Sequence, residues 1–265
     1  MSWHMGRLVA FDLETTGVDV EADRIVTATV IGLGGGRGTE PSNWIADPGV
    51  EIPDEAAKVH GITTEVARAK GRPAAEVVEE VTAALAAALT PGVALVGHNV
   101  GSYDLNLLHV ECLRYGLPTL SDRHPDGQVW PVLDTRVLDQ HVWPYRRRVS
   151  ETQGARVLKT CAQAYGLSWD DEAAHGSEYD ALVAARVLYR IGQVAHMDPN
   201  DWPPAIKQVR RPRFHELRDL DLETLHHRQI EWAAEQAAGL QAHFRKSDPA
   251  AVVDGSWPLR PWGTP

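Results

Sequence analysis

The chain has 265 residues, of which 43% are hydrophobic and 23% are charged, and its formal net charge at pH 7 is −10. This length and apolar content exclude a largely disordered chain and allow one sizeable domain with an extension. The negative charge is not typical of a general nucleic-acid-binding protein, although bound cations or a local basic patch can reverse the field at one site.

The first predicted elements are strands. Residues 8–12 form an apolar, β-rich run that ends at the turn-forming residues Thr15, Thr16 and Gly17. Residues 25–33 form a second such run, which stops at three glycines, and the short link between the runs favours an antiparallel hairpin. Residues 43–46 are a third predicted strand, which Pro48 stops.

Helices and short strands alternate after this hairpin. The sequence predicts helices at 53–59, 74–89, 103–115, 156–165 and 179–191, and short strands at 93–96 and 132–133. Asp134 is placed to be the N-cap of one further helix. This order of elements predicts an α/β domain over residues 6–193.

The amino-acid composition changes after residue 193. Four prolines between residues 197 and 214 predict a basic linker or wrapping arm over residues 194–221. Residues 222–246 are predicted to form one long amphipathic helix, with Leu225, Trp232 and Leu240 among its apolar positions. Residues 247–265, rich in Pro, Gly and Trp, are predicted to be irregular.

The two cysteines indicate the cellular compartment. Cys112 and Cys161 lie in helix-like segments and suggest no disulfide framework, which fits a reducing cytoplasm. The first residues, MSWHMGR, lack the features of a signal peptide, and the most apolar stretch, residues 81–89, is too short to span a bilayer. The sequence therefore predicts a soluble cytoplasmic protein without a membrane partner.

Two carboxylates end the first apolar run. Asp12 and Glu14 are two residues apart, so both side chains should project from the same face of an extended strand. Without a partner they would repel each other, whereas a hard divalent cation such as Mg²⁺ or Mn²⁺ prefers such oxygen ligands. The alternative is that both are exposed turn or cap residues.

Two later segments carry similar groups. Asp104 follows a short strand and opens a helix, where it could also serve as an N-cap. His175 stands just before a predicted helix, and Asp180 lies in its first turn. An imidazole there could act as a base beside a metal ligand, or it could be a solvated loop histidine. Together, four carboxylates and one histidine predict a site for two divalent ions and phosphoryl chemistry.

Three motifs in order resemble those of the DEDDh 3′→5′ exonucleases, the DnaQ-like family that includes the DNA polymerase III epsilon subunit and RNase T. The motifs are FDLETTG (11–17), HNVGSYDLNLL (98–108) and HGSEYDA (175–181). The segments VHGIT (59–63), LDTRVL (133–138) and LKTCAQAYGL (158–167) also resemble the family. The resemblance covers residues 6–192.

The resemblance implies a ribonuclease H-like fold with a mixed five-stranded sheet flanked by helices. It also implies that Asp12, Glu14, Asp104 and Asp180 bind two divalent ions, Mg²⁺ or Mn²⁺. His175 matches the general base that deprotonates the attacking water, and a histidine at this position places the chain in the DEDDh branch.

The resemblance also implies a set of substrate-binding residues. Thr15, Thr16 and Gly17 would line the terminal nucleotide, and His60 and Ile62 match positions near its base. His98 and Asn99 would support the second motif, where the family spacing is His-Asn-x-x-x-Asp. Here Asp104 follows His98 by six residues rather than five, so a bulge or longer turn near residues 101–102 must absorb one residue.

Two basic segments could contact nucleic acid. Residues 141–150 combine Trp143 and Tyr145 with three consecutive arginines, a pattern that suits stacking on bases and contact with phosphates. Five more cations stand at Lys207, Arg210, Arg211, Arg213 and Arg218. Both segments could equally be solvated surface.

These expectations combine into a metal-dependent 3′→5′ exonuclease that releases nucleoside 5′-monophosphates. Its expected substrate is a single-stranded or frayed 3′ end, of DNA in preference to RNA. The alternatives are an exoribonuclease that resembles RNase T or an oligoribonuclease, and a non-catalytic interaction subunit. An expected protein partner is a DNA polymerase or another replication or repair protein, which the C-terminal helix could dock.

Overall fold

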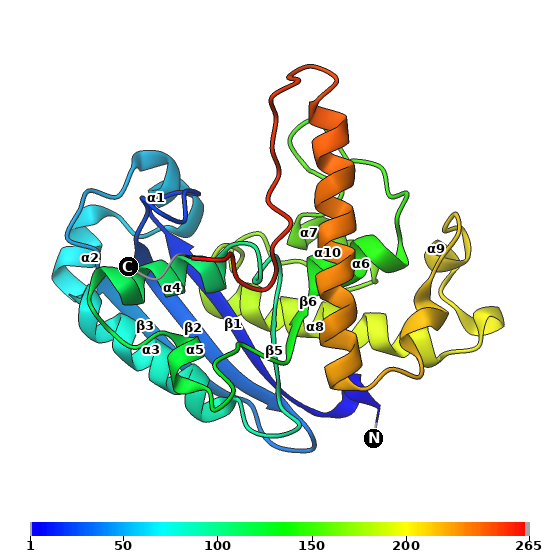
Figure 1. Cartoon of the computed structure of the whole chain (residues 1–265), viewed down its shortest axis with the longest axis horizontal. Helices are drawn as coiled ribbons and strands as arrows, with labels where there is room; N and C mark the ends of the chain where they lie inside the picture. Colours follow the sequence, from blue (N-terminus) through cyan, green and yellow to red (C-terminus); the bar gives the residue numbers. More distant parts are fainter. Residues whose placement is uncertain (1, 263–265) are drawn as a thin grey trace.

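The computed structural model describes residues 2–262, and a six-stranded sheet in the order β4–β3–β2–β1–β5–β6 lies at its centre (Figure 1). Strands β1 (Arg7–Thr15), β2 (Ile25–Gly34) and β3 (Glu40–Asp47) pair antiparallel. Strand β5 (Ala94–Gly97) pairs in parallel with β1, and β6 (Val132–Asp134) pairs in parallel with β5. The predicted hairpin of the first two strands is confirmed.

The sheet has one strand more than the five that the resemblance implied. The additional strand is β4, the two exposed residues Arg72–Pro73, which pairs in parallel with β3 at the outer edge. A proline can stand there because the outer side of an edge strand needs no N–H donor. Two residues carry too little periodicity to be recognised as a strand in the sequence.

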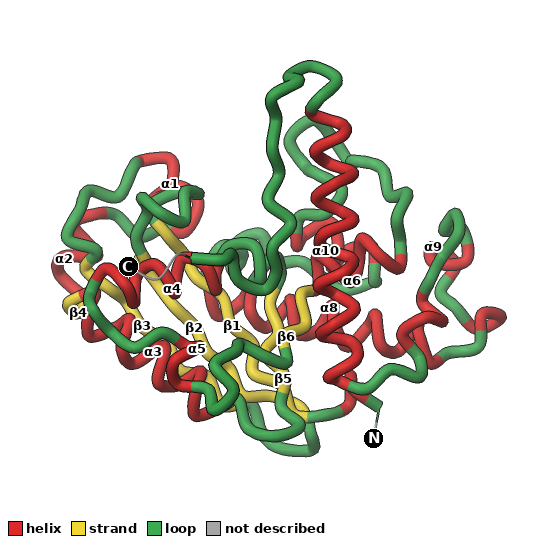
Figure 2. Tube along the Cα trace, viewed as in Figure 1, coloured by secondary structure: helices red, strands yellow, loops and turns green. Residues whose placement is uncertain are grey.

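Eight helices of the first 196 residues surround the sheet (Figure 2). They are α1 (Asp54–His60), α2 (Thr64–Lys70), α3 (Ala74–Ala88), α4 (Asp104–Arg114), α5 (Leu120–Arg123), α6 (Thr135–Val142), α7 (Leu158–Ala164) and α8 (Ser177–His196). Helix α8 packs across β1, β2 and β5, and α3 packs on β2 and β3. The short α2 and α5 were not predicted, although Thr63 and Thr119 cap them as the sequence would allow.

The segment that precedes the last helix is folded onto the rest of the chain. It contains η2 (Pro199–Asp201), α9 (Pro204–Lys207) and η3 (Phe214–Leu217), and the N-terminal turn η1 (Trp3–Met5) contacts it. Phe214 and Leu217 are completely buried. The indole Nε1 of Trp3 donates a hydrogen bond to the carbonyl oxygen of Leu217 over 2.9 Å.

Helix α10 (Leu222–Phe244) lies beside β6 and covers its free edge. The backbone N–H of Val132 donates to Nδ1 of His226 over 3.1 Å. The amide of Gln229 accepts from the backbone N–H of Asp134 over 2.8 Å and donates to the carbonyl of Val132 over 2.9 Å. These side chains satisfy the strand groups that another strand would otherwise satisfy.

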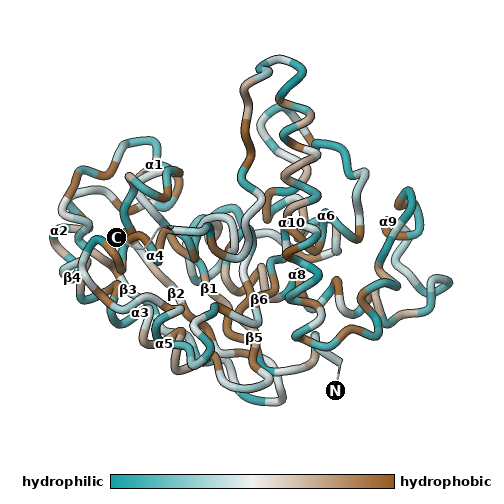
Figure 3. The backbone as a smooth tube through the Cα atoms, viewed as in Figure 1, coloured by the Kyte–Doolittle hydropathy of each residue, from teal (hydrophilic) through white to brown (hydrophobic). Residues whose placement is uncertain are grey.

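One continuous buried cluster unites the sheet with the C-terminal elements. It includes Val9 and Phe11 of β1, Leu95 of β5, and also Leu225 of α10 and Trp257 of the last segment. Figure 3 shows hydrophobic positions along the central strands, which agrees with their burial. The domain boundary near residue 193 stays a prediction. No helix within residues 2–262 combines the length and apolar character needed to cross a membrane.

Candidate functional site

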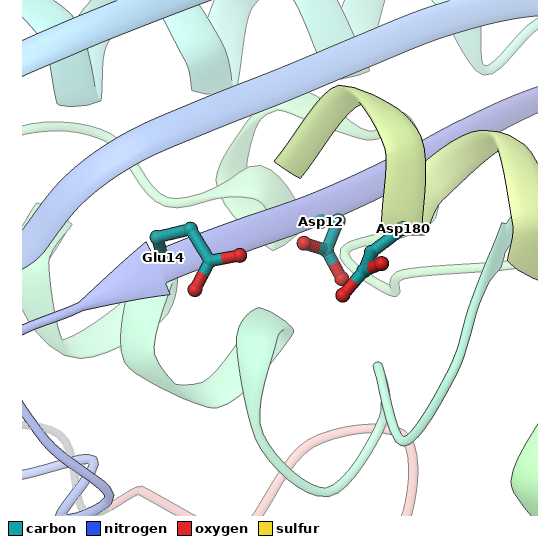
Figure 4. Close-up of side chains that lie close together, drawn as sticks. All are labelled: Asp12, Glu14 and Asp180. Atoms are coloured by element: carbon teal, nitrogen blue, oxygen red, sulfur yellow. The ribbon is translucent and has the colours of Figure 1, made fainter. Parts of the chain in front are cut away.

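Strand β1 places two carboxylates on one face of the sheet. Asp12 and Glu14 are partly exposed, whereas the alternating Phe11 and Leu13 are buried. Figure 4 shows both acidic side chains projecting from β1 toward the same space. The side-chain period of two in a strand produces this arrangement, as the sequence predicted.

Helix α8 contributes the third carboxylate. Asp180 lies in its first turn, and one oxygen each from Asp12, Glu14 and Asp180 lie within 4.8 Å of one another. The start of the helix is held on the sheet by Ser177, whose hydroxyl lies 2.8 Å from Oγ1 of Thr29. The predicted meeting of the first and third motifs is therefore present.

Asp104 lies beside this group of three rather than within it. It is the first residue of α4 and is 5% exposed, and its Oδ1 accepts a hydrogen bond of 3.1 Å from the backbone N–H of Leu13. The negative charge of Asp104 nevertheless raises the pKa values of Asp12 and Glu14. The bond to Leu13 fixes the start of α4 against the strand that carries the other two acids.

The carboxylates perturb one another strongly. Burial, and then the charges of Asp180 and Asp104, raise the pKa of Glu14 to about 8. Burial raises the pKa of Asp104 to about 7, although two backbone N–H groups act in the opposite direction. Burial and the neighbouring acids also raise the pKa of Asp12 well above its usual range. Four ionised carboxylates in this space would need a compensating cation.

An oxygen without a partner points to the same conclusion. Within residues 2–262, the buried Oδ1 of Asp180 has no hydrogen-bond partner. A buried polar atom of this kind calls for a ligand, and an all-oxygen donor set suits a hard divalent cation. The residues present therefore fit a divalent metal ion.

His175 stands close to this group of carboxylates. It is exposed, has a left-handed backbone with φ of 64°, and directly precedes Gly176, the N-cap of α8. Burial raises the pKa of Asp180, and the charge of His175 acts in the opposite direction, which reflects their proximity. His175 is therefore accessible to solvent or to a ligand beside Asp180.

The loop between His98 and Asp104 forms a turn. Asn99 has a φ of 68°, and its carbonyl accepts from the backbone N–H groups of Ser102 and Tyr103. The completely buried carboxylate of Asp134 accepts from the N–H groups of Asn99 and Gly101 over 2.9 and 3.1 Å. The sequence predicted Asp134 only as a helix cap, and its second role in this loop was missed.

His98 faces away from solvent into a network of its own. Its Nδ1 lies 2.8 Å from the hydroxyl of Thr135, and its Nε2 lies 2.8 Å from the carbonyl oxygen of Arg156. Both ring nitrogens therefore have partners inside the protein. His98 therefore has no free ring nitrogen for a substrate, and its bonds connect the start of the second motif to Thr135 and Arg156.

The turn after β1 is held by a residue that the sequence reasoning missed. The hydroxyl of Tyr103 lies 2.6 Å from Oγ1 of Thr15 and donates to the carbonyl of Gly17. Thr16 bonds to Asp23 over 2.7 Å, and a Cβ on Gly17 would overlap the Asp23 carboxylate. The only sequence signal for Tyr103 was its position next to Asp104.

His60 and Ile62 lie at the end of α1 and just beyond it. The Nδ1 of His60 accepts from the N–H of Ile62 over 3.2 Å, whereas its buried Nε2 has no partner among residues 2–262. Burial lowers the pKa of His60, and the backbone of Thr15 at the end of β1 acts in the opposite direction, so the ring lies near the end of β1. Ile62 packs on a small cluster that contains Val26 and Ile52.

The first basic segment is only partly available as a surface. Arg146 forms a buried ion pair with Asp139 and stacks over Trp143, with 4.4 Å between its Cζ and the ring centre. Arg147 and Arg148 are exposed, and so are the five cations between residues 207 and 218. Arg146 therefore holds the 143–156 loop together and does not present its charge to a ligand.

Comparisons with known proteins identify an exonuclease family for this chain. The family model RNase_T, described as exonuclease, matches residues 9–188. The DNA polymerase III subunit epsilon of Aquifex aeolicus is 27% identical over 186 residues, which are 70% of this chain and 80% of that protein. A PolC-type DNA polymerase III of Ureaplasma parvum is 27% identical over 182 residues, 68% of this chain and 11% of the polymerase.

Solved structures share the fold. Exonuclease I of E. coli in complex with a dT13 oligonucleotide has a TM-score of 0.57 at 17% identity, over 70% of this chain and 41% of that one. Exonuclease I of Methylocaldum szegediense has a TM-score of 0.58 at 19% identity, over 76% and 42% of the two chains. Both likenesses confirm the ribonuclease H-like α/β fold. From its motifs, its fold and the match to residues 9–188, the chain belongs to the RNase_T family of DnaQ-like exonucleases.

Proposed function

We propose that the protein is a metal-dependent 3′→5′ exonuclease of the DEDDh branch, which releases nucleoside 5′-monophosphates from single-stranded DNA. The observation that carries the proposal is the group formed by Asp12, Glu14 and Asp180, with ligand oxygens within 4.8 Å of one another. Membership of an exonuclease family makes phosphodiester hydrolysis the reaction that such a group would serve.

The proposed roles follow from position. Asp12, Glu14 and Asp180 would hold divalent ions, Mg²⁺ or Mn²⁺, with Asp104 completing the set. Two such ions, when bound, would activate a water for attack on phosphorus and stabilise the charge on the departing 3′ oxygen. His175, exposed beside Asp180, would accept the proton of the attacking water.

The end of the substrate would lie over the turn that follows β1. Thr15, Thr16 and Gly17 would border the terminal nucleotide mainly through backbone groups, since both threonine hydroxyls already have partners within the protein. The Nε2 of His60, which has no partner within residues 2–262, and the side chain of Ile62 would contact its base. His98 and Asn99 would act through the loop that leads to Asp104.

Single-stranded DNA is the proposed substrate, with RNA as the alternative. Support comes from fold relatives that were solved with the oligonucleotides dT13 and dA16, and from relatives named as DNA polymerase III proteins. The same names support a DNA polymerase or another replication or repair protein as a partner. A purely non-catalytic subunit is disfavoured because all four acids and His175 are present.

The test is a gel assay with 5′-labelled single-stranded DNA and RNA of one sequence, in Mg²⁺, Mn²⁺ or EDTA. Wild type should produce a metal-dependent ladder that shortens from the 3′ end, with DNA degraded faster, and Asp12→Ala should produce none. Asp219→Ala, which changes an exposed carboxylate outside the site, is the matched control. Intact strands with folded, metal-loaded wild type would reject catalysis by this chain alone.

A further inference from the structure

The last described segment of the chain returns to the loop of the second motif. After α10 the chain runs back along the helix, where Val253 donates to Gln241 over 3.1 Å, and it then reaches the start of α4 (Figure 1). Trp257 is 5% exposed and lies against the ring of His226, with 5.1 Å between ring centres. Residues 255–262 are called the C-terminal strap below.

The indole of Trp257 packs directly on Gly101. A Cβ built on Gly101 would lie 2.0 Å from Nε1 of Trp257 and 2.5 Å from its Cδ1. No side chain therefore fits at this position while the indole is in place. Gly101 stands three residues before Asp104, in the turn between His98 and α4.

Asn106 fastens the strap on the other side of Asp104. Its amide nitrogen donates to the carbonyls of Gly101 and Pro258 over 2.8 and 3.5 Å. Its Oδ1 accepts from the backbone N–H of Arg260 over 2.8 Å and from the indole of Trp262 over 3.0 Å. Asn106 is completely buried, and these four bonds use its full hydrogen-bonding capacity.

These contacts bracket one acidic residue. Gly101 and Asn106 flank Asp104 along the chain, and both contact the strap, while the Asp104 carboxylate accepts a bond from the N–H of Leu13. A turn of this kind benefits from such support, because each of its residues adds to the number of conformations open to the loop. Two separate parts of the strap, the indole of Trp257 and the backbone near residue 260, supply it.

We propose that the C-terminal strap is a positioning element for Asp104, and that Trp257 and Asn106 are its positioning residues. The inference rests on the proposed function, because it assigns Asp104 to the metal site. Without the strap the 99–104 turn would sample other conformations, and Asp104 would be presented to the metal less often. Groups that orient metal ligands from outside typically change metal affinity or activity by about 10- to 100-fold when they are lost.

The experiment compares Trp257→Ala with Trp202→Ala in the full chain. Trp202 is a matched control because it is 9% exposed, has its indole bonded to Val194, and lies outside the second motif. Both variants remove one buried indole, so a general loss of packing affects both. The measurements are the Mn²⁺ dissociation constant by calorimetry, kcat on labelled DNA, and amide hydrogen exchange over residues 99–106.

Trp257→Ala should weaken Mn²⁺ binding and lower kcat by about tenfold. It should also speed amide exchange of Gly101, Tyr103 and Leu105, while Trp202→Ala stays within about twofold of wild type in all three measurements. Trp257→Phe should retain most of the wild-type Mn²⁺ affinity, kcat and exchange protection. The indole Nε1 has no partner within residues 2–262, so only the ring volume is needed.

A second variant covers the case in which Trp257→Ala does not fold. Asn106→Asp removes the two donated bonds and keeps the two accepted ones, and it should raise exchange over the same residues. Equal Mn²⁺ affinity and equal exchange in the Trp257 and Trp202 variants would overturn the inference. Wild type without nuclease activity would instead overturn the proposed function, and the exchange measurement would still report on the strap.

Discussion

The acids of the site are stable together only in particular protonation or metal-bound states. The pKa of Glu14 is about 8 in the folded chain against an ordinary value of 4.5, because burial and the charges of Asp180 and Asp104 disfavour its ionised form. The folded state therefore holds this proton more tightly than the unfolded state does. The contribution of protonated Glu14 to the free energy of unfolding is fully present below about pH 4.5, and it is lost as the pH rises toward 8.

Metal removal should expose this dependence. In EDTA, we expect the melting temperature to fall by about 5 °C between pH 5 and pH 8, which corresponds to roughly 1–2 kcal/mol for a chain of this size. Saturating Mn²⁺ should remove most of the fall, because it binds the ionised carboxylates. Scanning calorimetry of wild type and Glu14→Gln checks this, and the substitution should flatten the curve in EDTA. A wild-type curve in EDTA that is flat, or that rises with pH, contradicts the prediction.

His175 should affect turnover and leave metal binding intact. Its side chain is exposed beside Asp180, so His175→Asn should lower kcat by about 10²- to 10⁴-fold, the usual contribution of a general base. The Mn²⁺ dissociation constant should change by less than about twofold, since the carboxylates remain. His215→Asn, which alters another exposed histidine on η3, should retain full activity. Loss of metal affinity equal to the loss of kcat would show a different role.

At the scale of the elements, α10 replaces a missing neighbour strand with side chains. Its amphipathic pattern predicts a helix that packs by Leu225 and Trp232, and both residues are buried. The pattern does not predict that the polar His226 and Gln229 also face inward, where they bond to Val132 and Asp134. That outcome requires the free edge of β6, which is formed by residues about a hundred positions earlier in the chain.

Gln229→Leu should strongly weaken the contact between α10 and β6. The substitution leaves the buried N–H of Asp134 and the carbonyl of Val132 without partners, so we expect a loss of about 3 kcal/mol in the free energy of unfolding. Gln236→Leu, on the same helix, loses one partly buried bond to Val137 and should cost less than about 1 kcal/mol. Urea denaturation measures both. Equal losses of unfolding free energy in the two variants would show that the bonds to the β6 edge do not account for the effect of Gln229→Leu.

At the scale of the whole molecule, one large hydrophobic cluster joins the elements before and after residue 193. Residues from η1, the sheet, η3, α10 and the C-terminal strap belong to one buried cluster, so the segments after residue 193 complete the packing of the segments before it. Phe214 and Leu217 are completely buried although they stand in a stretch that is rich in proline and arginine. The Pro-rich segment therefore packs against the rest of the chain through these residues.

A chain that ends at residue 193 should fold poorly. It would expose the edge of β6 and the surfaces that cover Phe214, Leu225 and Trp232, and we expect aggregation or the loss of a cooperative melting transition. A chain that ends at residue 246 keeps α10 and should melt cooperatively, with the weakened metal binding expected from loss of the strap. If the 193-residue chain melts at the full-length temperature, the first domain is independent.

The sequence by itself determined where each acid of the site lies within its own strand or helix. Asp12 and Glu14 share a face because strand side chains alternate, and Asp180 stands in the first turn of α8 because the helix begins just before it. The order of strands and helices was sufficient for the fold class. These features depend on residues within a few positions of one another, so periodicity and turn residues predict them.

Tertiary structure alone decided which groups meet across long distances in the chain. It turned both ring nitrogens of His98 inward, buried Arg146 against Asp139, and brought Trp257 onto Gly101 from more than 150 residues away. Each of these contacts depends on packing and on the hydrogen-bonding needs of buried groups, which no local pattern encodes. The sequence therefore predicted the acids of the site, and the folded chain decided what holds them in place.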